Sequence, residues 1–388
     1  MDTDLVHSLL SGGADHLIKL WDLTELDVNA KQTLHPTSKV SAGRFGITNL
    51  SFYPFDSAAF LSSSYDHHLK LYSTERLSVS ADFNLNSIIY SSAISPIADH
   101  LLVACATQHP AVRLVDLRSG DSTHSLAGHH GALLVVRWSP KLDHILASGG
   151  VDGTIRLWDV RKSSGSLGVL DMEDSLGVIG TDGLGRSSRD RQHGKSHSGA
   201  VNGITWTDDG MYVVSAGHDE RIRVWDAGTG ANTLANFGPT VKNGHLSTLN
   251  MVTTPTAYTP PGKELLLFPN EKEILMFELL EGKLLKRLRV PGPSMAAVRT
   301  RTGERNVKNR ITGLVWRGQA DGIYSSHTDG QIRAWLPRTV DDELLDKEEE
   351  EETQRRYDEE NEESQRKRKA LDDIYRSLTK QKITFGYG

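Results

Sequence analysis

Cysteine is almost absent from this sequence of 388 residues, which contains a single one, Cys105. One thiol cannot form a disulfide within the chain, so we expect a protein of a reducing compartment that relies on its core for stability. Long apolar runs are missing too, since none reaches the roughly 18 residues that a membrane-spanning helix needs. The first residues, MDTDLVHSLL, lack the basic stretch of a secretory signal. These absences argue against a secreted protein and against a membrane protein.

Patterns typical of metal or cofactor chemistry are equally scarce. The 16 histidines include the adjacent pairs His67-His68 and His129-His130. Neighbouring side chains point apart on any regular element, and a zinc site needs three or four converging ligands. No cofactor-binding motif accompanies these histidines. We therefore expect no metal, no cofactor and no catalytic site, which makes protein binding the default function.

What the sequence does contain is a repeat. Five times a serine is followed four residues later by an aspartate, and six residues after that by a tryptophan or a tyrosine. Each copy predicts a strand, a tight turn at the aspartate and a second strand that ends at the aromatic residue. The copies are Ser11/Asp15/Trp21, Ser62/Asp66/Tyr72, Ser148/Asp152/Trp158, Ser215/Asp219/Trp225 and Ser325/Asp329/Trp335.

Two weaker copies, at 101–117 and 265–279, keep the apolar strands but lose the turn aspartate, which gives seven hairpins in all. The smallest spacing between successive copies, 43 residues, matches the blade of about 40–45 residues in WD40 proteins. Three copies also end in Trp-Asp, and on these residues the sequence resembles the WD40 family. We predict an all-β, seven-bladed WD40 β-propeller over residues 1–337, followed by a charged, helical or partly disordered tail over 338–388.

The resemblance implies a structural role for the repeated residues. In WD40 blades a loop histidine, the serine, the aspartate and the tryptophan form a buried hydrogen-bond chain in which every polar group has a partner. A catalytic Ser-His-Asp triad is the alternative interpretation, but its repetition and the lack of an acyl-transfer motif argue against it. Blades 2 and 7 lack the histidine, with Gly43 and Val307 at the aligned positions, so we expect them to depend more on packing. The full set occurs twice, as His129, Ser148, Asp152, Trp158 and as His197, Ser215, Asp219, Trp225.

Charge is distributed unevenly. Residues 338–388 hold 16 acidic and 11 basic side chains, a net charge of −5, whereas the whole chain carries −6. The nearly neutral propeller is not expected to bind nucleic acid directly. The basic stretch 299–310 suits either a phosphate contact or a solvated insertion, with the insertion favoured, and 161–196 is expected to be a mobile loop.

The tail offers two further features. Leu371, Ile374, Tyr375 and Leu378 form a short apolar stripe at helical spacing, which suits docking on a partner or on the propeller itself. The basic run 366–369 suits either a nuclear import signal or simple solubilising charge.

A second motif points to one kind of partner. Trp158, Asp159 and Arg161 form a WDxR box, and Arg118 ends a degenerate box in the preceding blade. In propellers that serve as substrate receptors of cullin-4 ubiquitin ligases, this arginine contacts the adaptor DNA damage-binding protein 1. The alternative is an arginine that is merely solvated.

A wider similarity supports the first interpretation, because successive blades resemble the Cockayne syndrome A family in order, including the irregular third blade. The matching stretches are 51–72, 90–120, 126–165 and 197–238. The resemblance implies a non-catalytic nuclear ligase subunit of transcription-coupled nucleotide excision repair. Its implied partners are DNA damage-binding protein 1, the cullin-4 ligase, a Cockayne syndrome B-type remodeller and the RNA polymerase II complex. A general WD40 scaffold of a nuclear complex without ligase attachment is the runner-up, and a propeller enzyme comes third.

One departure from that family concerns the first blade. Family members carry a helical element that clasps the adaptor, a ring-closing strand and an inner strand before the position of Ser11, and Met1 lies too close to leave room for them. We expect an incomplete first blade, either because the chain begins late or because the ring closes imperfectly.

Overall fold

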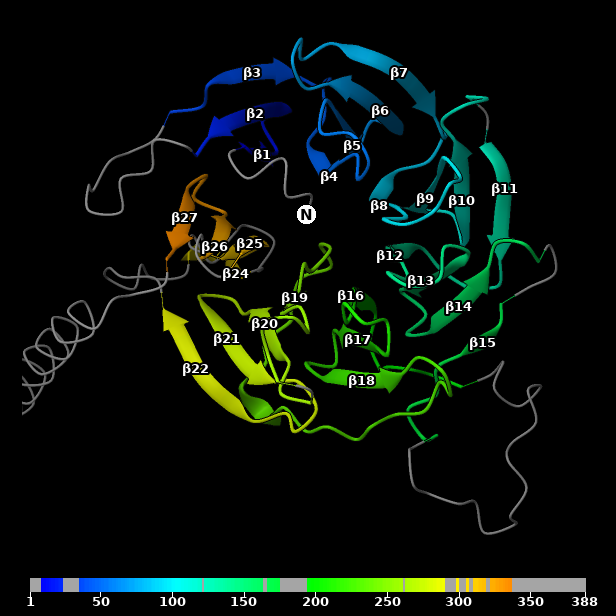
Figure 1. Ribbon diagram of the computed structural model, residues 1–388, viewed down its shortest axis with the longest axis vertical. Helices are drawn as coiled ribbons and strands as arrows, with labels where there is room; N and C mark the ends of the chain where they lie inside the picture. The colour runs from blue at the N-terminus through cyan, green and yellow to red at the C-terminus, as the bar shows by residue number, and fades with distance from the viewer. Residues whose placement is uncertain are drawn as a thin grey trace, which may run out of the picture. The chain divides into compact units, whose positions relative to one another are not determined.

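The computed structural model forms a ring of seven antiparallel sheets, each with three or four strands (Figure 1). The predicted all-β, seven-bladed WD40 propeller is confirmed. Within the ranges described, the one helical element is the short 3-10 turn η3 (Gly238–Thr240), and no helix there is long and apolar enough to cross a membrane. The structure describes residues 8–23, 35–120, 122–162, 166–174, 194–260, 262–289, 298–299, 305–306, 310–318 and 322–336.

The chain divides into two compact units, Met1–Trp335 and Leu336–Gly388. The predicted tail, with its apolar stripe and its basic run, lies outside the described residues, so its helical character stays a prediction. Most of the basic stretch 299–310 and of the expected loop 161–196 also lies outside them. The described part of the latter contributes strand β15 (Gly168–Val169).

Four blades have four strands, and in each of them sequence neighbours pair in order from the ring centre outward. Blade 2 contains β4 (Ile47–Phe52), β5 (Ala59–Ser64), β6 (His68–Ser73) and β7 (Val79–Asn84). Blade 3 contains β8 (Ile89–Ile94), β9 (Leu102–Thr107), β10 (Ala111–Asp116) and β11 (Ser122–Ala127). Blade 4 contains β12 (Leu133–Trp138), β13 (Ile145–Gly150), β14 (Ile155–Asp159) and β15. Blade 6 contains β19 (Val252–Thr253), β20 (Leu265–Pro269), β21 (Glu273–Glu278) and β22 (Leu284–Arg289).

Three blades show three strands within the described ranges. Blade 5 contains β16 (Val201–Trp206), β17 (Tyr212–Gly217) and β18 (Ile222–Asp226), and blade 7 contains β25 (Ile311–Gly318), β26 (Gly322–His327) and β27 (Ile332–Trp335). Blade 1 contains β1 (Ser8–Gly12), β2 (Leu17–Asp22) and β3 (Ser38–Ser41). A small separate hairpin, β23 (Val298–Arg299) with β24 (Arg305–Asn306), lies between blades 6 and 7 in the sequence.

Blade 1 has three strands among the described residues, where the sequence led us to expect an incomplete blade. Strand β1 carries Ser11, the residue that lies on the second strand of the other blades, so β1 to β3 are the second, third and fourth strands. Among the described residues, blade 1 therefore has no inner strand. Strand β27 is the third strand of blade 7, and no described strand pairs with its outer edge.

Every hairpin that carries the turn aspartate is built in the same way. The aspartate Oδ1 accepts a hydrogen bond from the backbone N–H two residues further on, as Asp152 does from Thr154 at 3.1 Å and Asp329 from Gln331 at 2.9 Å. The residue directly after the aspartate adopts a positive φ, 77° at Gly153 and 73° at His67. This is the chemistry that a tight hairpin requires, and it explains the spacing of the repeat.

The blades pack on one another through apolar faces. Val135 and Ala147 of blade 4 share one buried cluster with Val201, Ile204 and Trp225 of blade 5. Among the described residues, such clusters join each pair of successive blades from blade 1 to blade 7, so the core lies around the ring rather than at its centre.

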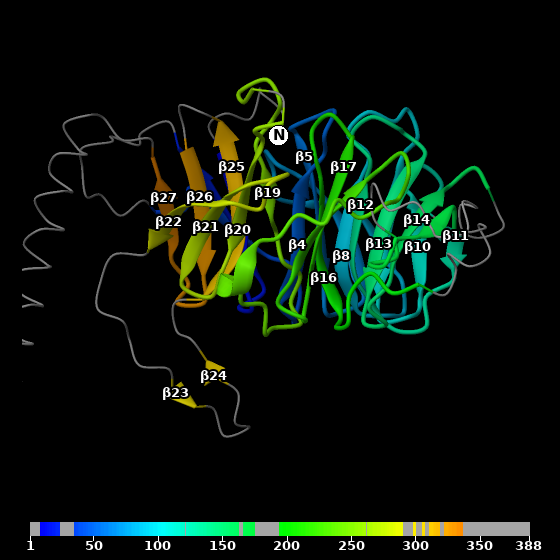
Figure 2. The same cartoon turned by 90° about the horizontal axis from the view of Figure 1, so that it is seen from below.

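Antiparallel pairing gives the ring two faces, because the strands of each blade run between them (Figure 2). We call face 1 the end that carries the loops between first and second strands and between third and fourth strands. Face 2 carries the hairpin turns between second and third strands, together with the connections from one blade to the next.

A strap crosses the middle of the ring. It consists of residues 243–250, between η3 and β19, and it reaches blades 3 and 4 on the other side (Figure 1). Thr248 Oγ1 lies 3.1 Å from the carbonyl oxygen of Tyr90 and 3.2 Å from that of Leu134. Arg137 on β12 donates to Asn250 Oδ1 at 2.9 Å. The strap therefore ties blade 6 to the opposite wall.

Candidate functional site

Blade 4 contains a continuous hydrogen-bond chain from its core to its turn. The Trp158 indole N–H donates to Ser148 Oγ at 2.7 Å, and Ser148 Oγ lies 2.8 Å from His129 Nε2. His129 Nδ1 lies 3.1 Å from Asp152 Oδ2, which also accepts from the backbone N–H of His130 at 3.0 Å. Each polar group in this chain has a partner, as burial demands.

Blade 5 repeats the arrangement with almost the same distances. Trp225 donates to Ser215 Oγ at 2.8 Å, Ser215 Oγ lies 2.8 Å from His197 Nε2, and His197 Nδ1 lies 2.9 Å from Asp219 Oδ1. Arg223 adds an ion pair to Asp219 at 2.8 Å. The sequence therefore named all eight members of the two chains.

Burial decides the protonation states in these chains. It lowers the pKa of His129 and of His197, so each imidazole is neutral, donates from Nδ1 to its aspartate and accepts at Nε2 from its serine. Burial alone would raise the pKa of Asp152, but the hydrogen bonds from His129 and from the backbone N–H groups of His130 and Thr154 outweigh it and hold that pKa well below its usual range. The Ser148 side chain is fully buried, so no substrate can reach its hydroxyl. These chains stabilise the blades and are not nucleophile sites.

Blade 7 pairs its serine with a different histidine. Its serine, Ser325, was expected to lack the loop histidine, and His327 on the same strand instead places Nε2 2.8 Å from Ser325 Oγ, a partner that the motif did not predict. Trp335 donates to the same oxygen at 2.8 Å. Val307, the aligned position, lies outside the described residues. The motif missed His327 because the side chain enters from within the hairpin rather than from the preceding loop.

Blade 2 replaces the histidine in another way. A side chain on Gly43 would clash with Asp66 Oδ2, and the Lys70 ammonium occupies this region, donating to the carbonyl oxygen of Ala42 at 2.6 Å. Phe60 and Tyr72 stack with ring centroids 5.0 Å apart. That this blade relies more on packing than the others stays a prediction.

The predicted adaptor-binding arginines lie on face 1, directly after the third strands of blades 3 and 4. Arg161 donates from Nε to Asp159 Oδ1 at 3.0 Å and from Nη2 to Asp159 Oδ2 at 2.9 Å. The Arg161 side chain is 64% exposed, whereas that of Asp159 is 4% exposed. The hydrogen bonds from Arg161 lower the pKa of Asp159 to about 2. A buried carboxylate therefore orients an exposed guanidinium.

Arg118 occupies the same turn in blade 3. Its backbone N–H donates to Asp116 Oδ1 at 2.9 Å, as that of Arg161 donates to Asp159 Oδ1 at 3.1 Å. Arg118 is also exposed. The structure thus presents two arginines from equivalent turns in neighbouring blades.

Trp158, the first residue of the predicted adaptor-binding box, has a different position. Its side chain is 0% exposed and belongs to the cluster between blades 3 and 4. It cannot itself contact a partner, so its part in the box is to anchor the end of β14. Among the four residues predicted for adaptor contact, Arg118 and Arg161 are the exposed ones.

Exposed apolar side chains lie on the same face as these arginines. In five successive blades, from blade 2 to blade 6, the loop between the first and second strands presents one of them. They are Phe55, Ile97, Leu142, Met211 and Tyr258, with exposures of 49%, 45%, 50%, 56% and 54%. Apolar residues exposed in a series, with arginine among them, are typical of protein interfaces.

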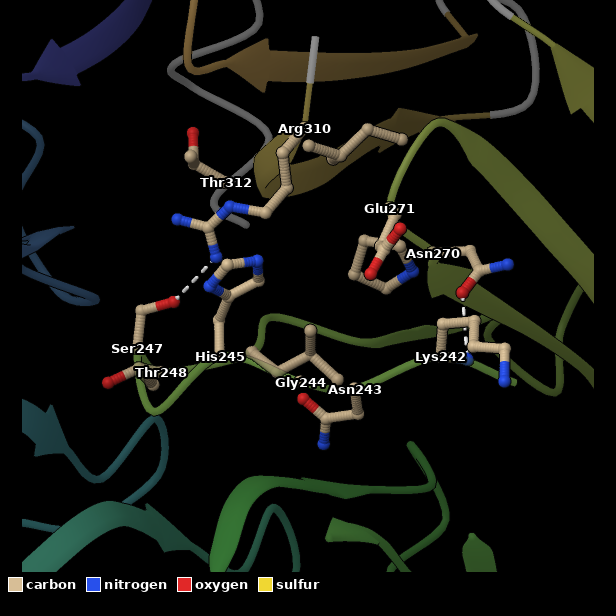
Figure 3. A pocket seen from close by; sticks show the side chains of 13 residues that line it. Lys242, Asn243, Gly244, His245, Ser247, Thr248, Asn270, Glu271, Arg310 and Thr312 are labelled. Atoms are coloured by element: carbon tan, nitrogen blue, oxygen red, sulfur yellow. Dashed lines mark hydrogen bonds between the residues drawn. The ribbon is translucent and has the colours of Figure 1, made fainter. Parts of the chain in front are cut away.

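A small polar cavity lies on face 2, where the strap meets blades 6 and 7 (Figure 3). Its volume is about 20 Å³, which is room for about one water molecule. Arg310 Nη1 donates across it to Ser247 Oγ at 3.1 Å. Burial lowers the pKa of Arg310. This cavity joins the strap to the start of blade 7 and is too small for a metabolite. In the part of the chain that the structure describes, no group of three or more potential metal ligands converges.

Comparison with known proteins agrees with this architecture. The model of the WD domain, G-beta repeat, matches residues 120–159 and 190–226, which contain strands β11 to β14 and β16 to β18. The WD repeat-containing protein ATCSA-1 of Arabidopsis thaliana is 28% identical over 406 residues, covering 88% of this chain and 85% of the plant protein.

Two other relatives are matched over less of their length. Radiation-sensitive protein 28 of Saccharomyces cerevisiae is 26% identical over 52% of this chain and 42% of the yeast protein. The ribosome biogenesis protein ytm1 of Aspergillus terreus is 28% identical over 56% of this chain and 50% of its own. The repeats, the seven blades and these similarities identify the chain as a WD40-repeat protein of β-propeller fold.

Proposed function

We propose that this chain is a substrate-receptor subunit of a cullin-4 ubiquitin ligase in transcription-coupled nucleotide excision repair. It acts in the nucleus and binds the adaptor DNA damage-binding protein 1 through face 1. Its further partners are a Cockayne syndrome B-type remodeller and the RNA polymerase II complex. WD40 propellers are typically non-catalytic scaffolds, and the chain acts as one.

The single observation that carries the proposal is the exposed Arg161, held in place by buried Asp159. A planar guanidinium offers several directed donors to a partner surface, and a fixed orientation reduces the entropy lost on binding. The equivalent turn supplies Arg118 in the next blade, and the apolar residues of face 1 lie in the neighbouring loops. This combination suits an extended interface with an arginine at its centre.

The relatives support the same proposal. The plant relative, matched over most of both chains, is named ATCSA-1, an abbreviation that corresponds to Cockayne syndrome A. The name of the yeast relative, radiation-sensitive protein 28, refers to sensitivity to radiation, which fits a role in DNA repair.

The experiment is affinity purification of the tagged full chain from cells, followed by quantification of adaptor and cullin-4 in the eluate. Arg161→Ala is expected to weaken adaptor binding about 10-fold or more, as for a central interface residue. Its fold should be retained, because Asp159 keeps the hydrogen bond from the backbone N–H of residue 161 at 3.1 Å, although the lost ion pair to this buried carboxylate lowers the thermal midpoint. Arg289→Ala is the matched control, since this side chain is 74% exposed on the outer strand β22. Equal recovery of the adaptor with all three proteins contradicts the proposal.

The second candidate is a nuclear WD40 scaffold without ligase attachment. It is favoured by the similarity to ytm1, whose name assigns it to ribosome biogenesis, and to subunit 2 of the type B histone acetyltransferase of Candida glabrata, which is 26% identical over 56% of this chain. On this alternative, the purification returns a stable set of nuclear proteins without the adaptor or cullin-4.

A further inference from the structure

Blade 3 departs from the other hairpins at all four positions of the hydrogen-bond chain. Strand register identifies these positions without ambiguity, because Cys105 pairs with Arg113 as Ser148 pairs with Arg156. Val115 then stands at the tryptophan position and His109 at the aspartate position. Leu85 stands at the histidine position, because it lies four residues before the start of β8, as His129 lies four residues before the start of β12.

Three of the four replacements are apolar and form part of one core cluster. Leu85, Cys105 and Val115 are 5%, 0% and 0% exposed and belong to the cluster that joins blades 2 and 3. Burial raises the pKa of the Cys105 thiol to about 12, so it packs as a neutral, apolar group. The polar chain of blades 4 and 5 is thus replaced by hydrophobic packing in blade 3.

The turn of blade 3 is also different. Pro110 follows His109, at the place where the other hairpins have a residue with positive φ such as Gly153 or Glu220. The proline ring fixes φ near −65°, so the aspartate-type turn cannot form here. His109 is accordingly exposed instead of pointing back to the strands.

The missing aspartate has an electrostatic consequence. Six blades place a basic residue on the third strand, opposite the serine or cysteine of the second: Lys19, Lys70, Arg113, Arg156, Arg223 and Arg333. Four of them form ion pairs with the turn aspartate four residues earlier, at 3.4, 4.0, 2.8 and 2.7 Å for Lys19, Lys70, Arg223 and Arg333. Asp152, beside Arg156, is instead held by His129. At Arg113 the position of that carboxylate is taken by His109.

Arg113 has no such partner among the residues that the structure describes. Its Nε is buried and makes no hydrogen bond there. The same is true of Arg156 Nε, so what sets Arg113 apart is the missing turn carboxylate, and a carboxylate supplied from outside would form the ion pair that four other blades form internally.

Arg113 lines a cavity of about 480 Å³ on face 2, between blades 2 and 3. The cavity is lined by His67 of blade 2, by the connection from Asn84 to Ser87, and by the turn from Gln108 to Pro110. Its described lining contains no aspartate or glutamate. It offers one permanent cation, two histidines, and amide groups that can both donate and accept hydrogen bonds.

The geometry points to a binding site for an acidic peptide segment of a partner protein, in which a glutamate or aspartate carboxylate pairs with Arg113. The carboxylate takes the place that Asp219 occupies beside Arg223 in blade 5. The fold itself holds a carboxylate on this row of cations in four other blades, which favours a carboxylate over other anions. The amides of Asn84, Asn86 and Gln108 suit the peptide backbone on either side. This inference goes beyond the ligase role and does not rest on it, because it concerns face 2 of the protein alone.

The test begins with a displayed library of random 12-residue peptides, selected for binding to the full chain. Selected peptides are synthesised with a fluorescent label and titrated by fluorescence polarisation. We expect them to carry a glutamate or aspartate whose replacement by the amide weakens binding about 10-fold or more, since a charge-assisted pair is lost. Arg113→Gln should weaken binding of the same peptides to a similar extent.

His109→Asp is the sharper variant. It supplies a carboxylate from within the chain, next to Arg113, and should abolish peptide binding while leaving the thermal midpoint unchanged or higher. Arg118→Gln is the control, because this exposed arginine lies on face 1, and it should bind the peptides as the unchanged protein does.

Three outcomes overturn the inference. The selection returns no acidic peptide, or the selected peptides bind His109→Asp and Arg113→Gln as tightly as the unchanged protein, or a phosphoserine in place of the glutamate binds more than about 10-fold tighter. The last result would assign the site to a phosphorylated ligand instead of a carboxylate.

Discussion

The hydrogen-bond chain of blade 4 allows a quantitative prediction for Ser148→Ala. The hydroxyl of Ser148 accepts from the Trp158 indole at 2.7 Å and serves His129 Nε2 at 2.8 Å. The Trp158 side chain is fully buried, and so is that of His129. The exchange therefore leaves one donor and one acceptor without partners in a place that water does not reach.

Each such unpaired group costs about 1–3 kcal/mol. We expect the free energy of unfolding to fall by about 2–4 kcal/mol, since the methyl group left behind packs as well as the hydroxyl did. The measurement is equilibrium unfolding in urea, followed by circular dichroism. Amide hydrogen exchange on β13 and β14 adds a local readout, because a propeller can lose one blade before the rest.

Ser11→Ala is the matched control in blade 1. Trp21 donates to Ser11 Oγ at 2.8 Å, almost the distance found in blade 4, but both residues are only half-buried. Water can replace the hydroxyl there, so the cost should stay below about 1 kcal/mol. Equal losses in the two variants would refute the reasoning, because they would show that burial does not set the cost of this bond.

Two further predictions concern pH and the strap. Burial lowers the pKa of His129 and of His197, so the unfolded chain binds more protons than the folded one once the pH falls below about 6.5. Stability is then fully present above that pH and is lost on acidification, by up to about 1.4 kcal/mol per pH unit for each histidine, and a thermal midpoint that stays constant between about pH 6.5 and 5 contradicts this. Thr248→Val keeps the shape of the strap but removes the hydroxyl that bonds Tyr90 and Leu134, so hydrogen exchange in residues 243–250 should become faster. Unchanged exchange there would mean that these bonds do not hold the strap.

The hairpins could be predicted because their information is local. Serine, turn aspartate and aromatic residue stand within eleven positions of one another, and strand pairing places them in register as expected, with Ser148 opposite Arg156 and Leu146 opposite Trp158. The aspartate also builds the turn itself through its bond to Thr154. A pattern that both forms the turn and fills the core can be recognised from the local sequence alone.

The strap and the replacements of the histidine could not be found in this way. Thr248 bonds to Tyr90 across 158 sequence positions and to Leu134 across 114, and only the arrangement of the blades in a ring brings these groups together. His327 bonds to the serine of its blade, and Lys70 lies at the histidine region of blade 2, both from positions that the motif does not specify. The sequence therefore did not predict the contacts between blades or the surfaces that these contacts leave exposed.

The same rule that makes Ser148→Ala costly explains how blade 3 tolerates the loss of the whole hydrogen-bond chain of histidine, serine, aspartate and tryptophan. Removing one partner of a buried hydrogen bond leaves the other unpaired, whereas removing all partners at once and filling the space with apolar atoms is nearly neutral. Blade 3 has made the complete exchange, with Leu85, Cys105 and Val115 packed together. Arg113 is the one member of the old arrangement that remains, and its buried Nε makes no hydrogen bond to any described residue. Because packing stabilises this blade, its turn does not need a carboxylate. Arg113, whose counterparts pair with a turn aspartate in four other blades, can therefore pair with a carboxylate of a partner protein.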